Sequence, residues 1–488
     1  MPRLIPVLFS LVFLPTLAHA GETLTLEAAL RESLEGNQQV RNAELQMKAA
    51  EGGVVAARGV FDPNLEVTGS LDWSESRDVF QGLVFDATTL NSSARSSVRG
   101  SLETGTSYRI IGSYGSVDRT TFGSFAQGLP PGEIKTLQAN PQIQLGVGQE
   151  VLRGHRTSFN RRQVIEAING YEVAELQLLA QQQRTLRDVA TAYWAWANAE
   201  ENLKITSNRV EVAEEALRVG RLQLQEGRVA PVDVSRLQTE LVRAEKARAD
   251  ALQAEREGAD TVATLIGRRP GADFVSGTSA DAKEVSTLVV ADAIEAVLAG
   301  NLDLAVLRRQ TEQAKLSTKL SRHAMLPSLT LDGSFSAGAV RVTQNGEADD
   351  PFPNQGVTGS ATFSMPLGNR AARGDLARSA ATESQRANEL LGLERDLAAQ
   401  AAKQVRVVNN AAEQVRLTDQ EVVLADETLK AEEARANAGR AVQRDVLEAR
   451  TSLFNAQIQA AKARTDRQLA LAELLLLQGN LSIESVVP

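Results

Sequence analysis

Two acids have the spacing that most suggests chemistry. Asp445 and Glu448 lie three positions apart in a stretch, 367–487, that contains no proline. Residues three apart on a helix share one face, so the two carboxylates would project together and attract cations. The simpler interpretation is that both acids stabilise a helix N-terminus through the macrodipole. Nothing around them distinguishes a catalytic pair from a solvated face.

Other residues that carry chemistry are scarce. The 488 residues include no cysteine and three histidines, of which only His155 and His323 lie beyond the first 20 positions. The lack of cysteine excludes disulfides, thiolate metal sites and lipid attachment through sulfur. No HExxH, P-loop or GxSxG motif is present. We therefore predict that the protein is not an enzyme and uses no cofactor or metal.

Residues 1–20 have the pattern of an export signal. Arg3 precedes a short apolar core, and the segment ends in Ala-His-Ala, so we expect signal peptidase to cut between Ala20 and Gly21. No later stretch is apolar enough for a spanning helix, so any membrane crossing must be made by strands. The net charge of −9 argues against nucleic acid as a partner.

The chain repeats itself. Asn37 and Pro63 recur 264 positions later as Asn301 and Pro327, and a second register with an offset of 212 relates the later parts of the two halves. Such self-similarity indicates a duplicated structural unit. The expected organisation is a first repeat at 21–268, a linker at 269–290, a second repeat at 291–480 and a tail at 481–488.

Alternating apolar and polar residues predict strands with two chemically different faces. The alternation extends over about ten residues, which is typical of transmembrane β-strands, although a soluble sheet with one wet face alternates in the same way. The predicted strands lie at about 64–75, 142–152, 328–339 and 357–366. Exposed loops are predicted at 77–92, 116–141 and 340–356. Residues 95–115 form a possible extra hairpin, whose membership of the sheet stays open.

So few strands cannot close a barrel, and an open sheet edge is not tolerated in lipid. If these are membrane strands, several protomers must share one barrel.

Long helices are predicted where proline is absent. Residues 156–224 would form a helix roughly 100 Å long at ~1.5 Å per residue. Apolar residues recur along it at the seven-residue spacing of a coiled coil, at Leu203, Val210, Leu217 and Leu224. The aromatic residues Tyr193, Trp194 and Trp196 could form a binding cluster, but packing within the helical layer is the better interpretation.

Two Gly-x5-Asp-Val runs predict helix–turn–helix connections. Gly227 and Gly439 would end one helix, and Asp233 and Asp445 would lie near the start of the next. Pro231 fits the first turn of a helix.

Together these features resemble the TolC family of outer-membrane efflux ducts. The doubled helix–strand–helix plan, the repeated Asn and Pro marks, the GxVAxxDV run at 227–234 and the run from Gly439 carry the resemblance, which covers nearly the whole mature chain. It implies a membrane α+β fold in a homotrimer. Each protomer would give four strands to a shared 12-stranded transmembrane β-barrel, and the helices would form a long periplasmic coiled-coil barrel.

The resemblance also implies roles for particular residues. Asp445 and Glu448 would form an acidic ring at the periplasmic gate, where the family has aspartate at both positions. The positions of the family's tyrosine–arginine latch correspond to Ala436 and Ala441, so the latch of this chain differs. The tip turns would dock a periplasmic adaptor through Gly227, Arg228, Val229, Ala230, Asp233, Gly439, Arg440 and Ala441.

The predicted function is an outer-membrane duct of a tripartite efflux or type I secretion system. It would conduct substrates passively from the periplasm and an inner-membrane pump to the exterior. The expected partners are two further copies, an adaptor, the pump and outer-membrane lipid. The alternatives are a periplasmic coiled-coil adaptor or structural rod, which would need no apolar strands, and a diffusion porin, which would need no long helices. The sequence does not identify the cargo.

Overall fold

A computed structural model describes residues 22–80, 83–123, 130–271, 274–278, 287–438 and 443–486. The chain falls into two compact units. One contains the residues up to Leu45, Leu176–Val306 and the residues from Leu391 onward; the other contains Gln46–Glu175 and Leu307–Leu390. Each unit therefore draws on both sequence repeats. The expected cleavage site at Ala20 and Gly21 lies outside the described residues.

The helices include very long ones where proline is absent. The helix α4 has 64 residues and α8 has 68, which correspond to lengths of roughly 100 Å. No helix among the described residues combines the length and the apolar character that a membrane span requires. The helices are α1 (Leu26–Gly36), α2 (Gln38–Arg58), η1 (Gly59–Phe61), α3 (Thr157–Asn160), α4 (Arg162–Gln225), α5 (Pro231–Leu265), α6 (Val290–Gly300), α7 (Leu302–Ala324), α8 (Arg370–Asn437), α9 (Gln443–Leu477) and α10 (Ile483–Val486).

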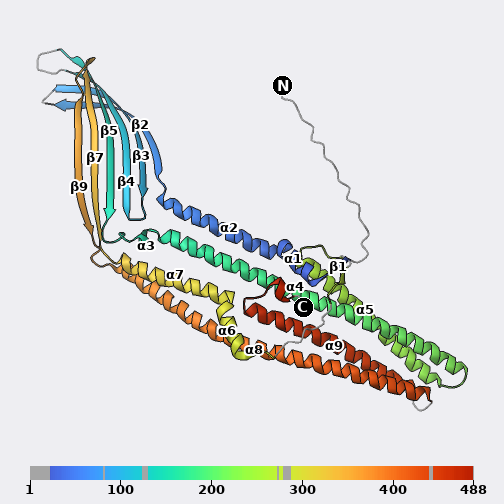
Figure 1. The fold of residues 1–488 in the computed structure, drawn as a ribbon. Helices are drawn as coiled ribbons and strands as arrows, with labels where there is room; N and C mark the ends of the chain where they lie inside the picture. The colour runs from blue at the N-terminus through green and yellow to red at the C-terminus, as the bar shows by residue number, and fades with distance from the viewer. Residues whose placement is uncertain are drawn as a thin grey trace, which may run out of the picture. The chain divides into compact units, whose positions relative to one another are not determined.

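One antiparallel sheet joins strands of both repeats (Figure 1). Its order is β2-β3-β4-β5-β7, and β7 pairs on its other side with β9 and with the short β8 (Glu347–Ala348). The long strands are β2 (Asn64–Phe80), β3 (Leu83–Ser101), β4 (Thr106–Gly123), β5 (Gly132–Glu150), β7 (Ser328–Gln344) and β9 (Phe352–Ser364). A separate parallel pair joins β1 (Glu22–Leu24) to β6 (Phe274–Ser276).

This sheet corrects the predicted loops. Strands cover 77–80, 83–92, 116–123 and 132–141, and 124–129 lies outside the described residues. The polar residues there form cross-strand contacts instead of turns, such as the 2.6 Å hydrogen bond between the Ser92 and Ser116 hydroxyls. Their backbone N–H and C=O groups are hydrogen-bonded to neighbouring strands. Local composition cannot predict these partners because they are far away in the sequence. In the third segment, β7 continues to Gln344, β8 covers Glu347–Ala348 and β9 begins at Phe352, so only 345–346 and 349–351 are turn or loop.

The strand number also differs from the expectation. Among the described residues the sheet contains six long strands, whereas the resemblance implied four from each protomer. The difference is the hairpin around 95–115, which belongs to the sheet as parts of β3 and β4 and turns at Gly105 with a φ of +80°. The hairpin joins because β4 pairs with β5 on its other side.

The two faces of the sheet differ in chemistry. Directly opposite residues in an antiparallel sheet share a face. The register places six apolar residues in one row across the sheet: Leu65, Val98, Ile110, Leu145, Phe335 and Val357. We call this side the apolar face. Many of its large side chains are exposed, such as Leu71 at 76% and Val357 at 83%.

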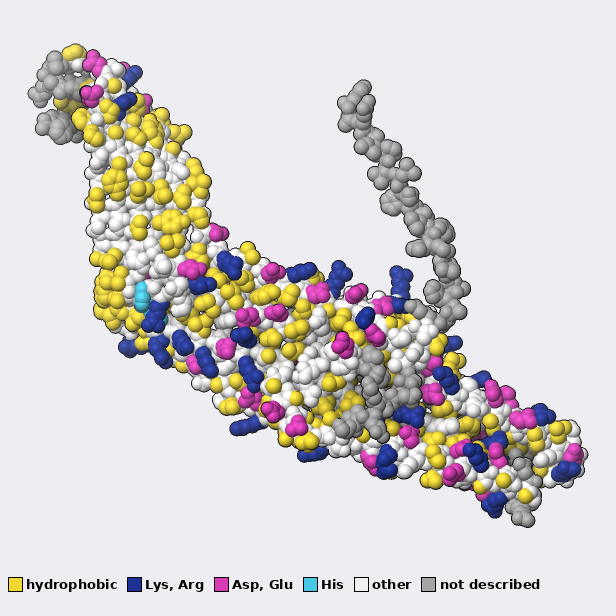
Figure 2. Space-filling model, in the orientation of Figure 1, with side chains coloured by type: hydrophobic (Ala, Val, Ile, Leu, Met, Phe, Trp, Pro, Cys, Tyr) yellow, Lys and Arg dark blue, Asp and Glu magenta, His cyan; other side chains and the backbone are white. Residues whose placement is uncertain are grey.

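The opposite side, the polar face, carries Ser, Thr, Asn and Gln together with charged residues. One of its rows reads Asn64, Arg99, Arg109, Gly146, Ser334 and Thr358. In the view of Figure 2, hydrophobic and uncharged side chains cover the middle of the strands, and charged side chains gather toward the strand ends.

Aromatic residues fill the main core of the helical unit. Tyr193, Trp194 and Trp196 are at most 1% exposed and meet in edge-on ring contacts. The Tyr193 hydroxyl donates to the Leu24 carbonyl at 2.9 Å, and the Trp196 indole donates to the Glu255 carboxylate at 3.2 Å. The packing interpretation of this cluster is therefore confirmed.

The repeated asparagines make equivalent contacts in the two halves. The Asn37 amide donates to the Leu265 carbonyl at 3.1 Å, and the Asn301 amide donates to the Leu477 carbonyl at 3.0 Å. Each asparagine oxygen also accepts a backbone N–H in the first turn of the following helix, α2 or α7. The residue thus caps one helix and ties it to the end of another.

Paired glycines accompany these asparagines. A Cβ on Gly36 would lie 2.4 Å from the Ile266 carbonyl oxygen, and one on Gly479 would lie 2.1 Å from the Gly300 carbonyl oxygen. Both contacts join backbone to backbone, so there is no room for a side chain. We call these contacts the glycine locks.

Candidate functional site

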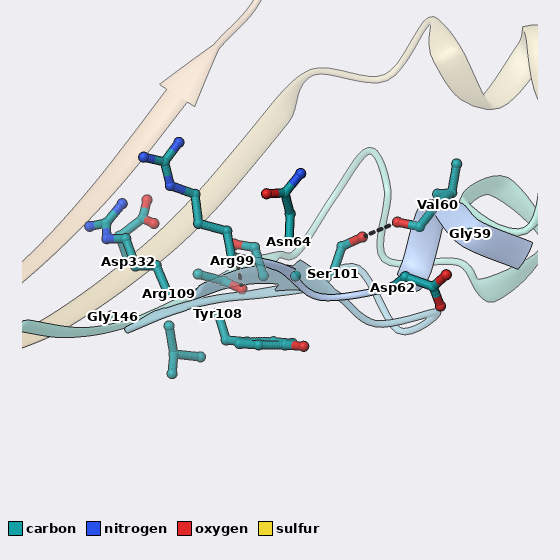
Figure 3. A pocket seen from close by; sticks show the side chains of 14 residues that line it. Gly59, Val60, Asp62, Asn64, Arg99, Ser101, Tyr108, Arg109, Gly146 and Asp332 are labelled. Atoms are coloured by element: carbon teal, nitrogen blue, oxygen red, sulfur yellow. Dashed lines mark hydrogen bonds between the residues drawn. The ribbon is translucent and has the colours of Figure 1, made fainter. Parts of the chain in front are cut away.

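A charged cluster occupies the polar face near one end of the strands (Figure 3). Arg99 of β3 lies directly opposite Arg109 of β4, and the Arg99 guanidinium is 3.3 Å from the Glu66 carboxylate of β2. Asp332 of β7 completes the cluster. Arg99, Arg109 and Asp332 line a hollow of about 480 Å³, and Tyr108 lies on the other side of the strands from the arginines.

Glycines in β5 make room for this cluster. A Cβ on Gly146 would lie 2.6 Å from the Arg109 Nε, and one on Gly148 would lie 2.6 Å from the Asp332 Oδ1. The long side chains therefore lie across β5 instead of standing away from it. The glycine-rich sequence of β5 thus serves side-chain placement on the polar face.

Both signs of charge are present on the polar face, and the ion pairs are open to water. Farther along the strands, the Arg119 guanidinium is 3.6 Å from the Asp78 carboxylate, with side chains 49% and 60% exposed. Exposed pairs of this kind contribute little stability because solvent screens them. The arrangement suits a hydrated surface. The sequence did not reveal this cluster because the place of the 95–115 hairpin, which carries Arg99 and Arg109, stayed open, and because Asp78 and Arg119 fell in predicted loops.

The turn between α4 and α5 has the geometry that its sequence predicts. Gly227 has a φ of +71°, and the Arg228 N–H donates to the Gln223 carbonyl at 2.8 Å, as in a Schellman helix end. The Asp233 carboxylate accepts the N–H of Ala230 at 3.3 Å and so closes the first turn of α5. A Cβ on Gly227 would meet nothing within 4 Å, so the turn is open to contact from outside.

The exposed end of this turn carries one cation. The Arg228 guanidinium pairs with the Glu226 carboxylate at 3.1 Å, and both side chains are more than half exposed. Val229 and Ala230 complete the turn. The equivalent residues of the second turn, Gly439, Arg440 and Ala441, lie outside the described residues.

The predicted acids lie at the start of α9. Asp445 is in the first turn, where its carboxylate is 3.2 Å from the Arg444 guanidinium, and Glu448 is exposed one turn later. The Arg444 side chain is 75% exposed, so water screens its charge. Nearby, the Arg450 guanidinium of α9 pairs with the Glu433 carboxylate of α8 at 2.6 Å, which links the two helices.

The structure brings together the two histidines that the sequence separates by 168 positions. The rings of His155 and His323 are 5.6 Å apart, and His323 also meets the ring of Phe159 at 5.2 Å. Burial lowers the pKa of His323, and the positive charges of Arg156 and His155 lower it further. Among the described residues no cluster of three or more His, Asp or Glu side chains could hold a metal ion.

Comparisons with known proteins all point to outer-membrane proteins. The sequence model of a family described as outer membrane efflux protein matches residues 138–268 and 293–480. The outer membrane protein TolC of Vibrio cholerae is 26% identical over 339 residues, which cover 64% of this chain and 72% of TolC.

Solved structures show the same fold. The outer membrane protein VceC of Vibrio cholerae superposes with a TM-score of 0.63 at 17% identity, over 93% of this chain and 96% of VceC. The MtrE outer membrane channel of Neisseria gonorrhoeae superposes with a TM-score of 0.62 at 17% identity, over 94% of this chain and 89% of MtrE.

Proposed function

Because this chain belongs to the outer membrane efflux protein family, we propose that three copies form a passive duct from the periplasm to the exterior. The duct acts in series with a periplasmic adaptor and an inner-membrane pump. The observation that carries the proposal is the two-faced sheet, whose apolar face suits lipid and whose polar face suits a water-filled lumen.

The alternatives fit the molecule less well. A periplasmic adaptor or rod would leave large apolar side chains of the sheet in water, among them Val67 at 72% and Leu71 at 76% exposure. A stand-alone porin would have no use for helices of 64 and 68 residues. We infer a conduit and not a catalyst, with export signalled by residues 1–20 and cleavage between Ala20 and Gly21.

We assign two further roles within this proposal. Asp445 and Glu448 of three copies form an acidic ring of six carboxylates, which favours cations. The turns at Gly227–Asp233 and Gly439–Ala441 dock the adaptor. The open, water-exposed geometry of the first turn supports docking there.

Purified mature protein in planar bilayers tests the duct. We expect trimers that need detergent and that conduct ions after insertion. A water-soluble monomer without conductance would refute the proposal.

Substitution of Gly227 by Trp tests docking at the turn. We expect export from cells to fall while detergent-extracted trimers persist, because the bulky ring occupies the docking surface. Gly346→Trp is the matched control, since Gly346 also has a positive φ, +90°, and open space around it. Normal export by the Gly227 variant would exclude docking at this turn.

A further inference from the structure

We propose that each copy gives six strands to the shared barrel, closed by pairing β2 of one copy with β9 of the next. Three copies then enclose eighteen strands. This inference rests on the proposed trimeric duct and specifies how its membrane part is built. It differs from the twelve strands that the resemblance implied.

The two outer strands of the sheet each have one free edge. Within the described chain β2 pairs only with β3, and β9 pairs only with the opposite side of β7. The backbone N–H and C=O groups along the other edges have no partner in one copy. Such groups cannot stay unpaired in lipid, so a second copy of this chain must cover them.

The directions of the two edges match. Successive long strands run antiparallel from β2 through β5 and on through β7 to β9. Six is an even number, so β2 and β9 run in opposite directions, and edge-to-edge contact between copies continues the antiparallel pattern. A sheet with an odd number of strands would break that pattern at every junction.

The faces also match. On β2 the apolar face carries Leu65, Val67 and Leu71, and on β9 it carries Val357 and Phe363. Joining the edges with these residues on one side continues both faces around a closed ring. The thirteen residues of β9 include no charge, and the apolar side of β2 carries none before Glu75, so nothing along most of the junction blocks pairing.

The hairpin of β2 and β3 cannot be treated as an appendage beside a smaller barrel. Its pairing with β4 is continuous from Ser101 opposite Ser107 to Phe85 opposite Gly123. Removing it from the barrel would require β4 to exchange this whole ladder for a partner on another copy. It would also leave Leu71 and Trp73, 76% and 66% exposed, without a place in lipid.

The consequence is a wider pore. Barrel diameter grows roughly linearly with strand number, so eighteen strands give a lumen about 1.5 times as wide as twelve. Barrels of 16–18 strands leave an open aqueous channel. The arginine-bearing rows of the polar face then line this wide passage in three copies, and large or hydrated cargo passes without stripping its water.

Cysteine cross-linking tests the junction, and the chain offers a clean background because it has no cysteine. Ser70→Cys on the polar face of β2 is combined in turn with a cysteine at each of several polar-face positions of β9. Stagger between copies decides which partner is nearest, so a series is needed. The β9 positions are Asn354, Thr358, Ser360 and Thr362.

We expect at least one double variant to form covalent dimers and trimers on oxidation of membranes, seen on non-reducing gels. Ala361→Cys and Phe363→Cys are the matched controls, because their side chains lie on the apolar face and cannot reach Ser70→Cys. These control pairs are expected to stay monomeric on the gel.

Two results would overturn the junction while leaving the duct intact. One is the formation of native trimers by the double variants without a cross-link between Ser70→Cys and any of the β9 cysteines. The other is cross-linking of Ser113→Cys, on the polar face of β4, with the β9 series, which would mean four strands per copy. A wild-type protein that forms no trimers would instead refute the proposed function, and this junction with it.

Discussion

The glycine locks lead to a prediction that separates backbone strain from close packing. Gly479 and Gly227 have nearly the same backbone conformation, with φ of +67° and +71°. They differ in their surroundings: a Cβ on Gly479 would lie 2.1 Å from the Gly300 oxygen, whereas one on Gly227 would meet nothing within 4 Å. Alanine at either position tests the two effects separately.

The magnitudes follow from these two facts. Placing a residue with a Cβ in the left-handed region costs about 1–2 kcal/mol, and this cost applies to both variants. At Gly479 the backbone must also shift, and overpacking of this kind costs a further ~1–3 kcal/mol. We therefore expect Gly479→Ala to lose roughly twice the free energy of unfolding that Gly227→Ala loses. Gly267→Ala, with a φ of +84° and a Gly36 oxygen at 2.6 Å, should behave like Gly479→Ala.

The assay is denaturant unfolding of detergent-solubilised protein, followed by the helical circular dichroism signal. Asparagine variants give a second comparison, because Asn tolerates the left-handed region better than Ala does. Gly227→Asn should be close to wild type, while Gly479→Asn should remain strongly destabilised. Equal losses at the two positions would show that the close backbone contact of the locks does not limit stability.

Three further predictions concern charge. Exchanging Asp445 for Asn together with Glu448 for Gln should bring the cation-to-anion permeability ratio close to one, read from reversal potentials under a salt gradient; an unchanged ratio excludes the acidic ring. Leu71→Arg should cost about 2–4 kcal/mol and reduce assembled protein in outer-membrane fractions, because it places a charge on the lipid side, while Ser70→Arg on the polar face should assemble normally; equal assembly would contradict the assignment of faces. Burial lowers the pKa of His323 in the folded state, so the contribution of neutral His323 to the stability of the fold is complete above about pH 7 and is lost as the pH falls through the folded pKa. His323→Gln should therefore flatten the dependence of melting temperature on pH between about 8 and 5. A variant profile with the wild-type slope would rule out this histidine as the cause.

The sequence predicted the elements whose signals are local. The alternation around Leu65 and Leu331 identified β2 and β7, and the absence of proline identified α4 and α8. The turn at Gly227 followed from the preference of glycine for a left-handed helix end.

Features that depend on distant partners were not predictable in this way. The serine- and threonine-rich ends of β2 and β3 resemble loops until the neighbouring strand is known, because their hydrogen bonds are non-local. The repeated Asn37 and Asn301 marked the duplication in the sequence. Their structural role, hydrogen bonding to the carbonyls of Leu265 and Leu477, depends on residues far away in the chain. No sequence motif predicted the contact between the rings of His155 and His323.

The pairing of β5 with β7 has a consequence for biosynthesis. The strands β2 to β5 follow one another closely and can pair hairpin by hairpin, but Glu150 must find Thr330 and Thr136 must find Gln344. These contacts span 180 and 208 positions of chain, which makes them slow to form. Until the second repeat has been secreted, β5 presents a long unpaired edge beside an apolar surface, a combination that aggregates readily. We therefore expect the nascent chain to be most prone to aggregation in the interval between the emergence of β5 and that of β7.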